Sequence, residues 1–118
     1  MEKILLFQID PAAAKQIARL ASAMKIKAIS VSGEWYNQKL GWIADHQVSR
    51  ESEKDAGNLP GSLLVFCGLT ERHLDKMLLK LRQEKIAVDF KAVLTPTNRE
   101  WTVQRLYLEM VRERKAGE

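Results

Sequence analysis

Two stretches of the chain are continuously apolar, and two others mix apolar with charged residues. Ile4–Phe7 (ILLF) and Leu63–Cys67 (LLVFC) are uninterrupted apolar runs, which predict strands that are buried on both faces. Ile26–Val31 and Ile86–Leu94 interleave lysine or aspartate with apolar residues, as strands with a wetter face or an edge position do. The pattern therefore predicts two central strands and two outer ones.

Helical spacing separates these strands. Residues 11–24 and 71–84 each carry apolar side chains at i, i+3, i+4 and i+7, the spacing of a helix with one apolar face. Pro11 fits the first turn of the former helix, and Thr70 is the expected N-cap of the latter. Each helix leads from a central strand to an outer strand, so we expect two βαβ units with right-handed crossovers.

The second half of the chain resembles the first. Glu34–Leu40 (EWYNQKL) and Glu100–Leu106 (EWTVQRL) are identical at four of seven positions, including a tryptophan. The preceding segments also align: Phe7 with Phe66, Asp10 with Thr70, Ile17 with Met77, and Lys25-Ile26 with Lys85-Ile86. Chance similarity between two amphipathic segments is the alternative. We interpret residues 1–118 as a single domain made of two βαβα repeats, 3–46 and 63–115, with a polar linker over 47–62.

The duplication predicts an α/β fold with a mainly parallel four-stranded sheet in the order 2-1-3-4, with helices packed on it. In an all-parallel sheet the first helix of each repeat lies on opposite faces. The central strands then meet at a topological switch point, where open α/β sheets bind ligands. The loops at that point would be Gln8–Asp10 and Cys67–Thr70. An antiparallel central pair with all helices on one face also satisfies the repeat; we favour the parallel version.

The composition is that of a soluble globular protein, with 46% hydrophobic and 29% charged residues. We expect a cytoplasmic location, because no apolar run has the length of a signal peptide core or a membrane span, and the single cysteine, Cys67, excludes an internal disulfide. A net charge of +4 is modest. Nucleic-acid binding is therefore only a weak alternative.

Cys67-Gly68 is the first candidate for chemistry. A thiol between a strand and a helix N-terminus can have a lowered pKa and act as a nucleophile. His46 and His73 show no spacing that brings them to Cys67, and a small buried hydrophobe is the favoured interpretation. His73 is expected to be a solvated helix residue. The spacing of the two histidines and one cysteine indicates no metal site, and no motif indicates a cofactor.

A second candidate is the stretch LTPTNREW, residues 94–101. Thr97 and Glu100 fit a capping box, with Thr97 as the N-cap of a helix and Glu100 as its N3 residue. Thr95, Asn98 and Arg99 are left over beside the free N–H groups of a helix start, where small anions also bind.

The tryptophans indicate a surface rather than a catalytic site. If helices begin near Glu34 and Thr97, Trp35 and Trp42 share a face away from the core, as do Trp101 and Leu108. Such a face packs against another helix of the chain or against a partner, for example in a homodimer. Gly41 should shorten the first of these helices to about two turns.

The C-terminal half is also recognisable. Leu63–Met110, through LLVFCG and above all KAVLTPTNREWT, closely resembles a bacterial family catalogued as domain of unknown function 3783. The N-terminal segments KILLFQID and NQKLGWIAD look like the region that usually precedes that domain. The resemblance implies a small bacterial cytoplasmic protein with no assigned activity, cofactor or partner, so it transfers no functional residue.

Together these observations favour a non-enzymatic binding or regulatory module for a small anionic ligand or a protein partner. Its candidate ligand-binding residues are Asp10, Cys67, Gly68, Thr70, Thr95, Thr97, Asn98 and Arg99. Its candidate interface residues are Trp35, Trp42, Trp101 and Leu108. The alternatives are a small enzyme with Cys67 as nucleophile and a weak nucleic-acid binder.

Overall fold

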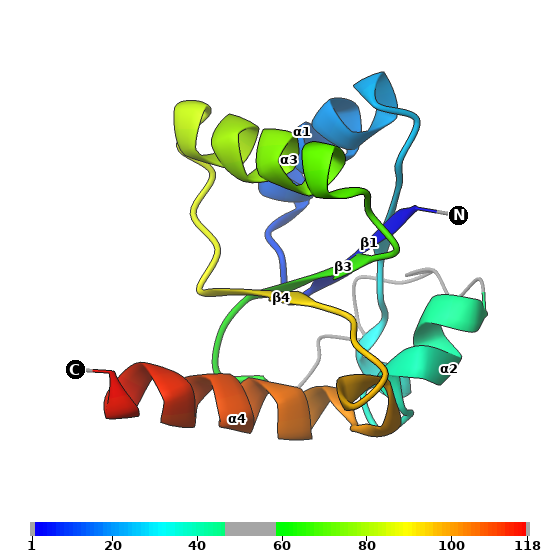
Figure 1. Cartoon of the computed structure of the whole chain (residues 1–118), viewed down its shortest axis with the longest axis vertical. Coiled ribbons are helices and arrows are strands. Elements are labelled where there is room, and N and C mark those ends of the chain that lie inside the picture. The colour runs from blue at the N-terminus through cyan, green and yellow to red at the C-terminus, as the bar shows by residue number, and fades with distance from the viewer. Residues whose placement is uncertain (1, 47–58, 118) are drawn as a thin grey trace.

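A four-stranded sheet forms the middle layer of the protein in a computed structural model, which describes residues 2–46 and 59–117 (Figure 1). The strand order is β2-β1-β3-β4, which confirms the predicted order. The strands are β1 (Lys3–Phe7), β2 (Lys27–Ser30), β3 (Leu63–Cys67) and β4 (Phe90–Val93). Most of the predicted linker, residues 47–58, lies outside the described residues.

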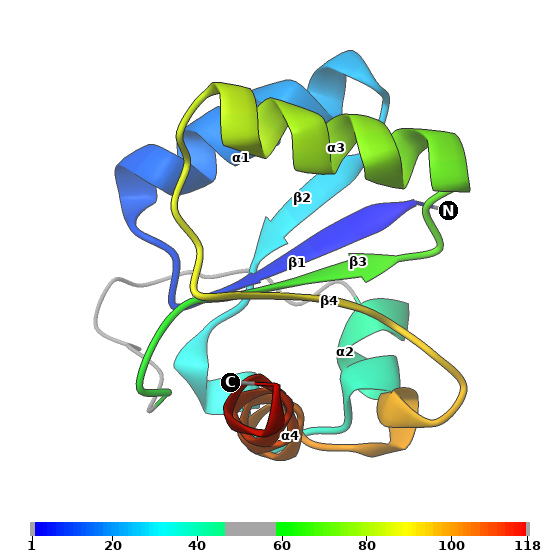
Figure 2. The same cartoon turned by 60° about the vertical axis from the view of Figure 1, so that its left-hand side comes forward.

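Helices cover both faces of the sheet, two on each (Figure 2). On one face lie α1 (Pro11–Ala23) and α3 (Glu71–Gln83), and on the other lie α2 (Leu40–Asp45) and α4 (Val103–Ala116). Short 3-10 turns, Gly33–Trp35 and Asn98–Glu100, precede α2 and α4. With six residues, α2 is as short as Gly41 predicts. None of the described helices is long and apolar enough to span a bilayer.

The two central strands are antiparallel, so the all-parallel prediction is wrong. Lys3 lies opposite Cys67, and Phe7 lies opposite Leu63, whereas β1–β2 and β3–β4 are parallel pairs. The β3–β4 unit steps to the opposite side from the β1–β2 unit and also runs in the opposite direction, so two right-handed crossovers place α1 and α3 on the same face. The expectation that these helices lie on opposite faces is therefore wrong. The alternative is confirmed for the antiparallel central pair and is wrong in placing all helices on one face, because α2 and α4 cover the other.

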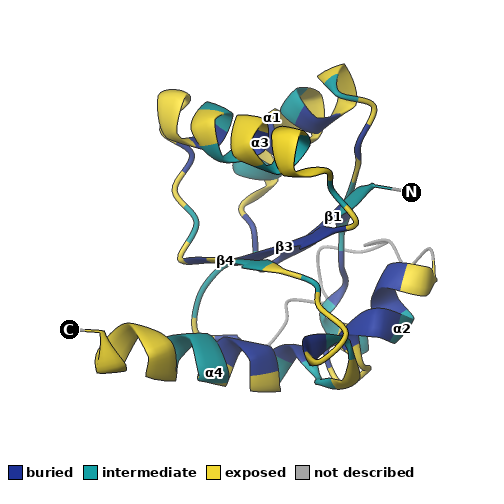
Figure 3. Cartoon of the chain, viewed as in Figure 1, coloured by how far each residue is buried: buried dark blue, intermediate teal, exposed yellow. Residues whose placement is uncertain are grey.

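The central strands are buried on both faces because each face has its own apolar cluster (Figure 3). Successive side chains of a strand point to opposite faces. Ile4 and Phe66 therefore pack with α1 and α3, whereas Leu5 and Val65 pack with α2 and α4. All four side chains are at most 1% exposed. This double burial is why the sequences of β1 and β3 are continuously apolar.

Candidate functional site

The structure separates the two loops that were predicted to form one crevice. Because β1 and β3 are antiparallel, Asp10 follows the end of β1 that lies beside the start of β3, and Thr70 lies at the other end of the sheet. Each residue caps a helix. The Asp10 carboxylate accepts from the Ala12 and Ala13 amides at 3.2 and 3.3 Å, and the Thr70 hydroxyl accepts from the His73 amide at 3.1 Å.

Cys67 and Gly68 line a small pocket of about 250 Å³ at the end of β3. Lys3, Asp45 and Leu94 complete its polar and apolar walls, together with Ala44, whose carbonyl accepts from the Lys3 ammonium. Burial raises the pKa of the Cys67 thiol to about 12. At neutral pH the thiol is therefore protonated, and a protonated thiol is a poor nucleophile.

The loop after β4 is held by its own side chains. The Thr95 amide donates to Asn98 Oδ1 at 2.8 Å, the Asn98 amide donates to Thr95 Oγ1 at 3.0 Å, and Asn98 Nδ2 donates to the Val93 carbonyl at 2.9 Å. These bonds satisfy the amide and the hydroxyl of Thr95. They also satisfy the side-chain amide of Asn98, which is buried at 8% exposed. They hold the loop through contacts within the chain.

The predicted capping box at Thr97 is wrong. Thr97 makes no side-chain cap bond, and α4 begins at Val103 with Thr102 as its N-cap, whose hydroxyl accepts from the Arg105 amide at 3.2 Å. Glu100 instead pairs with Lys39 at 3.0 Å. The pattern of Thr97 and Glu100 matches a capping box, but the chain makes a 3-10 turn there and starts the helix one threonine later.

Arg99 joins this loop to α2. Its guanidinium lies 2.8 Å from the Asp45 carboxylate, and it packs so closely on Gly41 that a Cβ there would lie 2.6 Å from Nε. Gly41 therefore leaves room for Arg99. Arg99 is engaged within the chain, which weakens its candidacy as an anion ligand.

The tryptophans lie on the α2 and α4 face, half-buried against its core cluster. Trp35 and Trp101 precede α2 and α4 rather than lying within them, so the predicted helical phasing is wrong. The rings of Trp35 and Trp42 are nevertheless 5.4 Å apart, and Arg105 lies 4.7 Å from the Trp101 ring. Leu108 is 58% exposed. A role of these four residues in an interface stays a prediction.

His73 is not the solvated residue that its helical position predicted. Its Nδ1 lies 2.7 Å from a Glu2 carboxylate oxygen, and the Thr70 amide donates to the same oxygen at 3.0 Å. The bond from Thr70, followed by that from His73, lowers the pKa of Glu2. These contacts tie the N-terminal segment to the start of α3.

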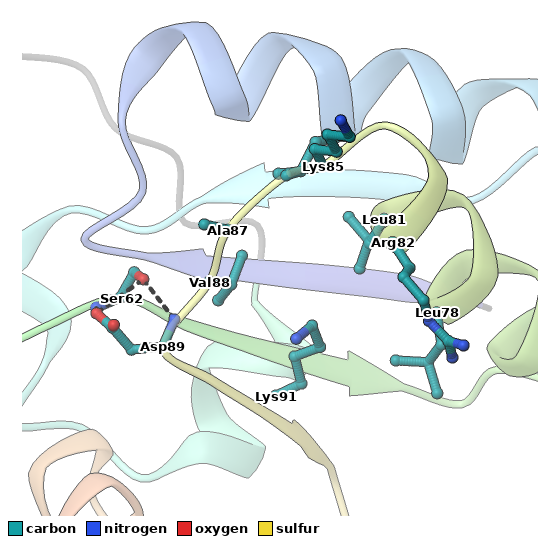
Figure 4. A pocket seen from close by; sticks show the side chains of 10 residues that line it. Ser62, Leu78, Leu81, Arg82, Lys85, Ala87, Val88, Asp89 and Lys91 are labelled. Carbon is teal, nitrogen blue, oxygen red and sulfur yellow. Dashed lines mark hydrogen bonds between the residues drawn. The ribbon is translucent and has the colours of Figure 1, made fainter.

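A groove of about 680 Å³ lies beside β4, under the C-terminal end of α3 (Figure 4). Its apolar wall includes Leu78, Leu81 and Val88, and its cationic side chains are Arg82, Lys85 and Lys91. We name it the basic groove. The chain leaves α3 through Lys85, whose φ is 56°, and then runs irregularly to Phe90, where β4 starts. The predicted strand from Ile86 therefore begins four residues late, and this detour lines the groove.

The charge of the basic groove is not neutralised from within. Its one carboxylate, Asp89, accepts from the Ser62 amide at 2.8 Å and from the Ser62 hydroxyl at 3.2 Å, as Figure 4 illustrates for this pair. Arg82, Lys85 and Lys91 form no ion pair with any described residue. Sequence reasoning missed the groove because these cations look like ordinary solvated side chains. The charged residues around the apolar Val88 were the only available signal.

No metal centre emerges from residues 2–46 and 59–117, in which no three histidine, cysteine or acidic side chains gather as metal ligands would. The hydroxyl of the basic groove that lies beside a carboxylate is that of Ser62, which donates to Asp89 at 3.2 Å. The arrangement offers positive charge beside apolar surface.

Comparison with known proteins identifies a family for about half of the chain. A search of curated proteins and a search of solved structures each gave no significant match. The expected resemblance of the C-terminal half is confirmed, and the N-terminal repeat lies outside the match. Through residues 62–116, which include the basic groove, the chain belongs to the family described as a domain of unknown function, DUF3783.

Proposed function

We propose that this protein is a non-enzymatic binding module that recognises an acidic segment of a protein partner in the basic groove. The observation that carries the proposal is the set of three cations, Arg82, Lys85 and Lys91, around one cavity without an acidic partner among the described residues. Opposite charge steers such a partner and orients it on binding.

The apolar wall supports a protein segment over a free anion. Leu78, Leu81 and Val88 offer contact area beside the charges, and burial of apolar surface adds affinity that a small inorganic anion cannot provide. A small anionic ligand remains the alternative within this proposal. A reducing cytoplasmic location fits the single free thiol.

The other two hypotheses have less support. An enzyme that uses Cys67 as nucleophile would need a thiolate, yet burial raises the pKa of this thiol to about 12. A nucleic-acid binder would need cations along a phosphate backbone, whereas the basic groove holds its three around one cavity.

The test is binding of a fluorescently labelled hexaglutamate at low ionic strength, followed by anisotropy. Replacing Arg82, Lys85 and Lys91 together by glutamine should weaken binding by about tenfold or more, since each exposed charge pair contributes up to about 1 kcal/mol. The control replaces Lys15, Arg72 and Lys76 by glutamine; it removes the same charge from exposed positions on α1 and α3 outside the groove. It should change affinity by less than about threefold.

Equal losses in the two triple variants would contradict the proposal, because binding would then follow net charge alone. Inorganic phosphate and a 20-base-pair DNA duplex serve as further probes. Full displacement of the peptide by millimolar phosphate would favour the small anion. Tight, salt-sensitive DNA binding without peptide binding would overturn the proposal in favour of nucleic acid.

A further inference from the structure

The outer edge of β4 has backbone groups that no described residue satisfies. The Phe90 amide donates to the Ser62 carbonyl at 3.1 Å, and the Leu94 amide donates to the Phe66 carbonyl at 2.9 Å. Backbone groups of residues two apart in a strand point the same way, so those of Lys91 and Val93 point away from β3. Asn98 already donates to the Val93 carbonyl. The Lys91 amide and carbonyl and the Val93 amide have no partner within residues 2–46 and 59–117.

Two cavities with different chemistry flank this edge. On the α3 side lies the basic groove, to which β4 contributes Lys91. On the α4 side lies a second pocket of about 270 Å³, which includes apolar Leu106 and Met110 and acidic Glu109 and Glu113. In Figure 1, β4 runs between α3 and α4. The surroundings of the edge therefore differ between the two faces of the sheet.

We propose that the acidic partner binds as an extended strand added to the outer edge of β4, with acidic side chains toward α3 and apolar side chains toward α4. This inference rests on the proposed function and specifies the conformation and sequence pattern of the partner. Successive side chains of an added strand alternate between the faces. Acidic ones then meet Arg82, Lys85 and Lys91, while apolar ones meet Leu106 and Met110.

Charge selects this occupant over a second copy of the chain. Two copies could pair their β4 edges about a twofold axis perpendicular to the sheet. They would then form one continuous sheet, with α3 of both copies on the same face. Lys91 of one copy would then lie beside the cations of the basic groove of the other, and like charges directly across a strand pair are destabilising. A lysine on an edge strand is a common device against such self-pairing. An acidic strand converts the same lysine into a favourable contact.

Backbone methylation of a peptide tests the added strand directly. The probe is acetyl-Glu-Val-Glu-Val-Glu-Val-Glu-amide, compared with one version N-methylated at the glutamates and one N-methylated at the valines. All three carry the same charge. In a strand only alternate amides face the neighbouring strand, so one methylated set should weaken binding about tenfold, through lost hydrogen bonds, and the other should be tolerated.

The set of amides whose methylation weakens binding shows whether the added strand runs parallel or antiparallel to β4. In an antiparallel pair the amides that bond to β4 belong to residues on the same face as Lys91, here the glutamates; in a parallel pair they belong to the valines. Equal affinities of the three peptides, or equal losses in both methylated ones, would overturn the added strand while leaving the acidic site intact. Failure of the unmodified peptide to bind would instead overturn the proposed function.

A variant of the protein provides an independent check. Val93→Pro removes one outward amide and no bond to β3, a position where edge strands tolerate proline. Val93→Ala trims the side chain and keeps the amide. We expect Val93→Pro to weaken peptide binding about tenfold and Val93→Ala to change it little, with the cations untouched in both. Unchanged binding by folded Val93→Pro would overturn the inference; if it does not fold, the methylated peptides decide.

Discussion

The two halves of the molecule follow each other residue for residue until each leaves its first helix, and then they diverge. Asp10 and Thr70 cap α1 and α3, and Lys25 and Lys85 leave these helices with φ of 59° and 56°. All these pairs are 60 positions apart. Yet β2 begins at Lys27 and β4 begins at Phe90, which is 63 positions later. The second half therefore has three extra residues before its outer strand.

Those three residues, Ala87, Val88 and Asp89, all line the basic groove. A short insertion moves the outer strand away from the helix that precedes it, and the space between them is lined by side chains from both. The comparison shows how two similar halves can differ at the step from helix to outer strand. The duplication as an evolutionary event stays a prediction, although the element order of the two halves is the same.

The largest expected effect concerns Cys67. It ends β3 as Phe7 ends β1, 60 positions earlier, so the predicted alignment of Phe7 with Phe66 is wrong by one residue. We expect iodoacetamide to alkylate the folded protein at pH 8 at least about 100-fold more slowly than the urea-unfolded chain, because the folded thiol has a raised pKa and is buried. Mass spectrometry gives both rates. A rate near that of the unfolded chain would restore Cys67 as a candidate nucleophile.

The raised pKa of Cys67 also makes the stability of the protein depend on pH. A thiol whose pKa is higher in the folded state loses its proton first in the unfolded chain. Its contribution to stability is therefore complete below the ordinary pKa of 9.0 and declines as pH rises toward about 12. Cys67→Ala should remove this part of the alkaline loss of stability, as measured by urea unfolding at pH 8 and pH 10.

Matched core substitutions test whether the halves form one cooperative unit. Ile17 and Met77 hold equivalent places in α1 and α3, are fully buried, and belong to the same apolar cluster. Ile17→Ala and Met77→Ala should each lower the free energy of unfolding by about 2–5 kcal/mol, with one transition in urea. Leu79→Ala, at a 46% exposed position, should change it by less than about 1 kcal/mol. Two separate transitions would show that the halves unfold independently.

A smaller effect on stability is expected at the N-caps of α1 and α3. Asp10→Ala and Thr70→Ala should each cost about 1 kcal/mol of stability, because each leaves helix amides without their side-chain acceptor. Asp10→Asn and Thr70→Ser keep an acceptor and should recover most of the loss. Thermal unfolding measures both pairs. A cap whose removal costs nothing would contradict the equivalence of the two helix starts.

The smallest expected effect concerns Glu2, at a position where the two halves differ again. Glu2 holds the start of α3, whereas Ser62, 60 positions later, binds Asp89. The bonds from Thr70 and His73 lower the pKa of Glu2, so its contribution to stability is present above its unfolded pKa and is lost as pH falls through the folded pKa. Glu2→Gln should slightly lower the melting temperature at pH 7 and match the wild type in strong acid. A difference that persists in acid would mean that charge is not the cause.

The sequence predicts the elements and the strand order better than the direction of the strands. Apolar runs such as Ile4–Phe7 reveal burial on both faces, and a buried strand is equally apolar whether its neighbour is parallel or antiparallel. Only the pairing of Lys3 with Cys67 settles the direction. The same fact separates Asp10 from Cys67, so the predicted crevice depended on the least determined property of the fold.

The start of a helix was predicted correctly where the sequence offers one good N-cap residue, and wrongly where it offers two. Thr70 is the single good N-cap before α3, and it caps. Before α4, both Thr97 and Thr102 fit, and the loop bonds between Thr95 and Asn98 favour the later start. The basic groove was beyond prediction, because it depends on how far the chain detours between Ile86 and Phe90.

Amide hydrogen exchange at the two sheet edges tests the central claim most directly. The Lys27 amide donates to Glu2 and the Val31 amide to Leu6, so the outward amides of β2 are those of Ala28 and Ser30, the counterparts of Lys91 and Val93. With the acidic heptapeptide bound, we predict slower exchange at Lys91 and Val93 and unchanged exchange at Ala28 and Ser30. Equal protection at both edges, or none at Lys91 and Val93 when the peptide is bound, would contradict a specific strand site beside the basic groove.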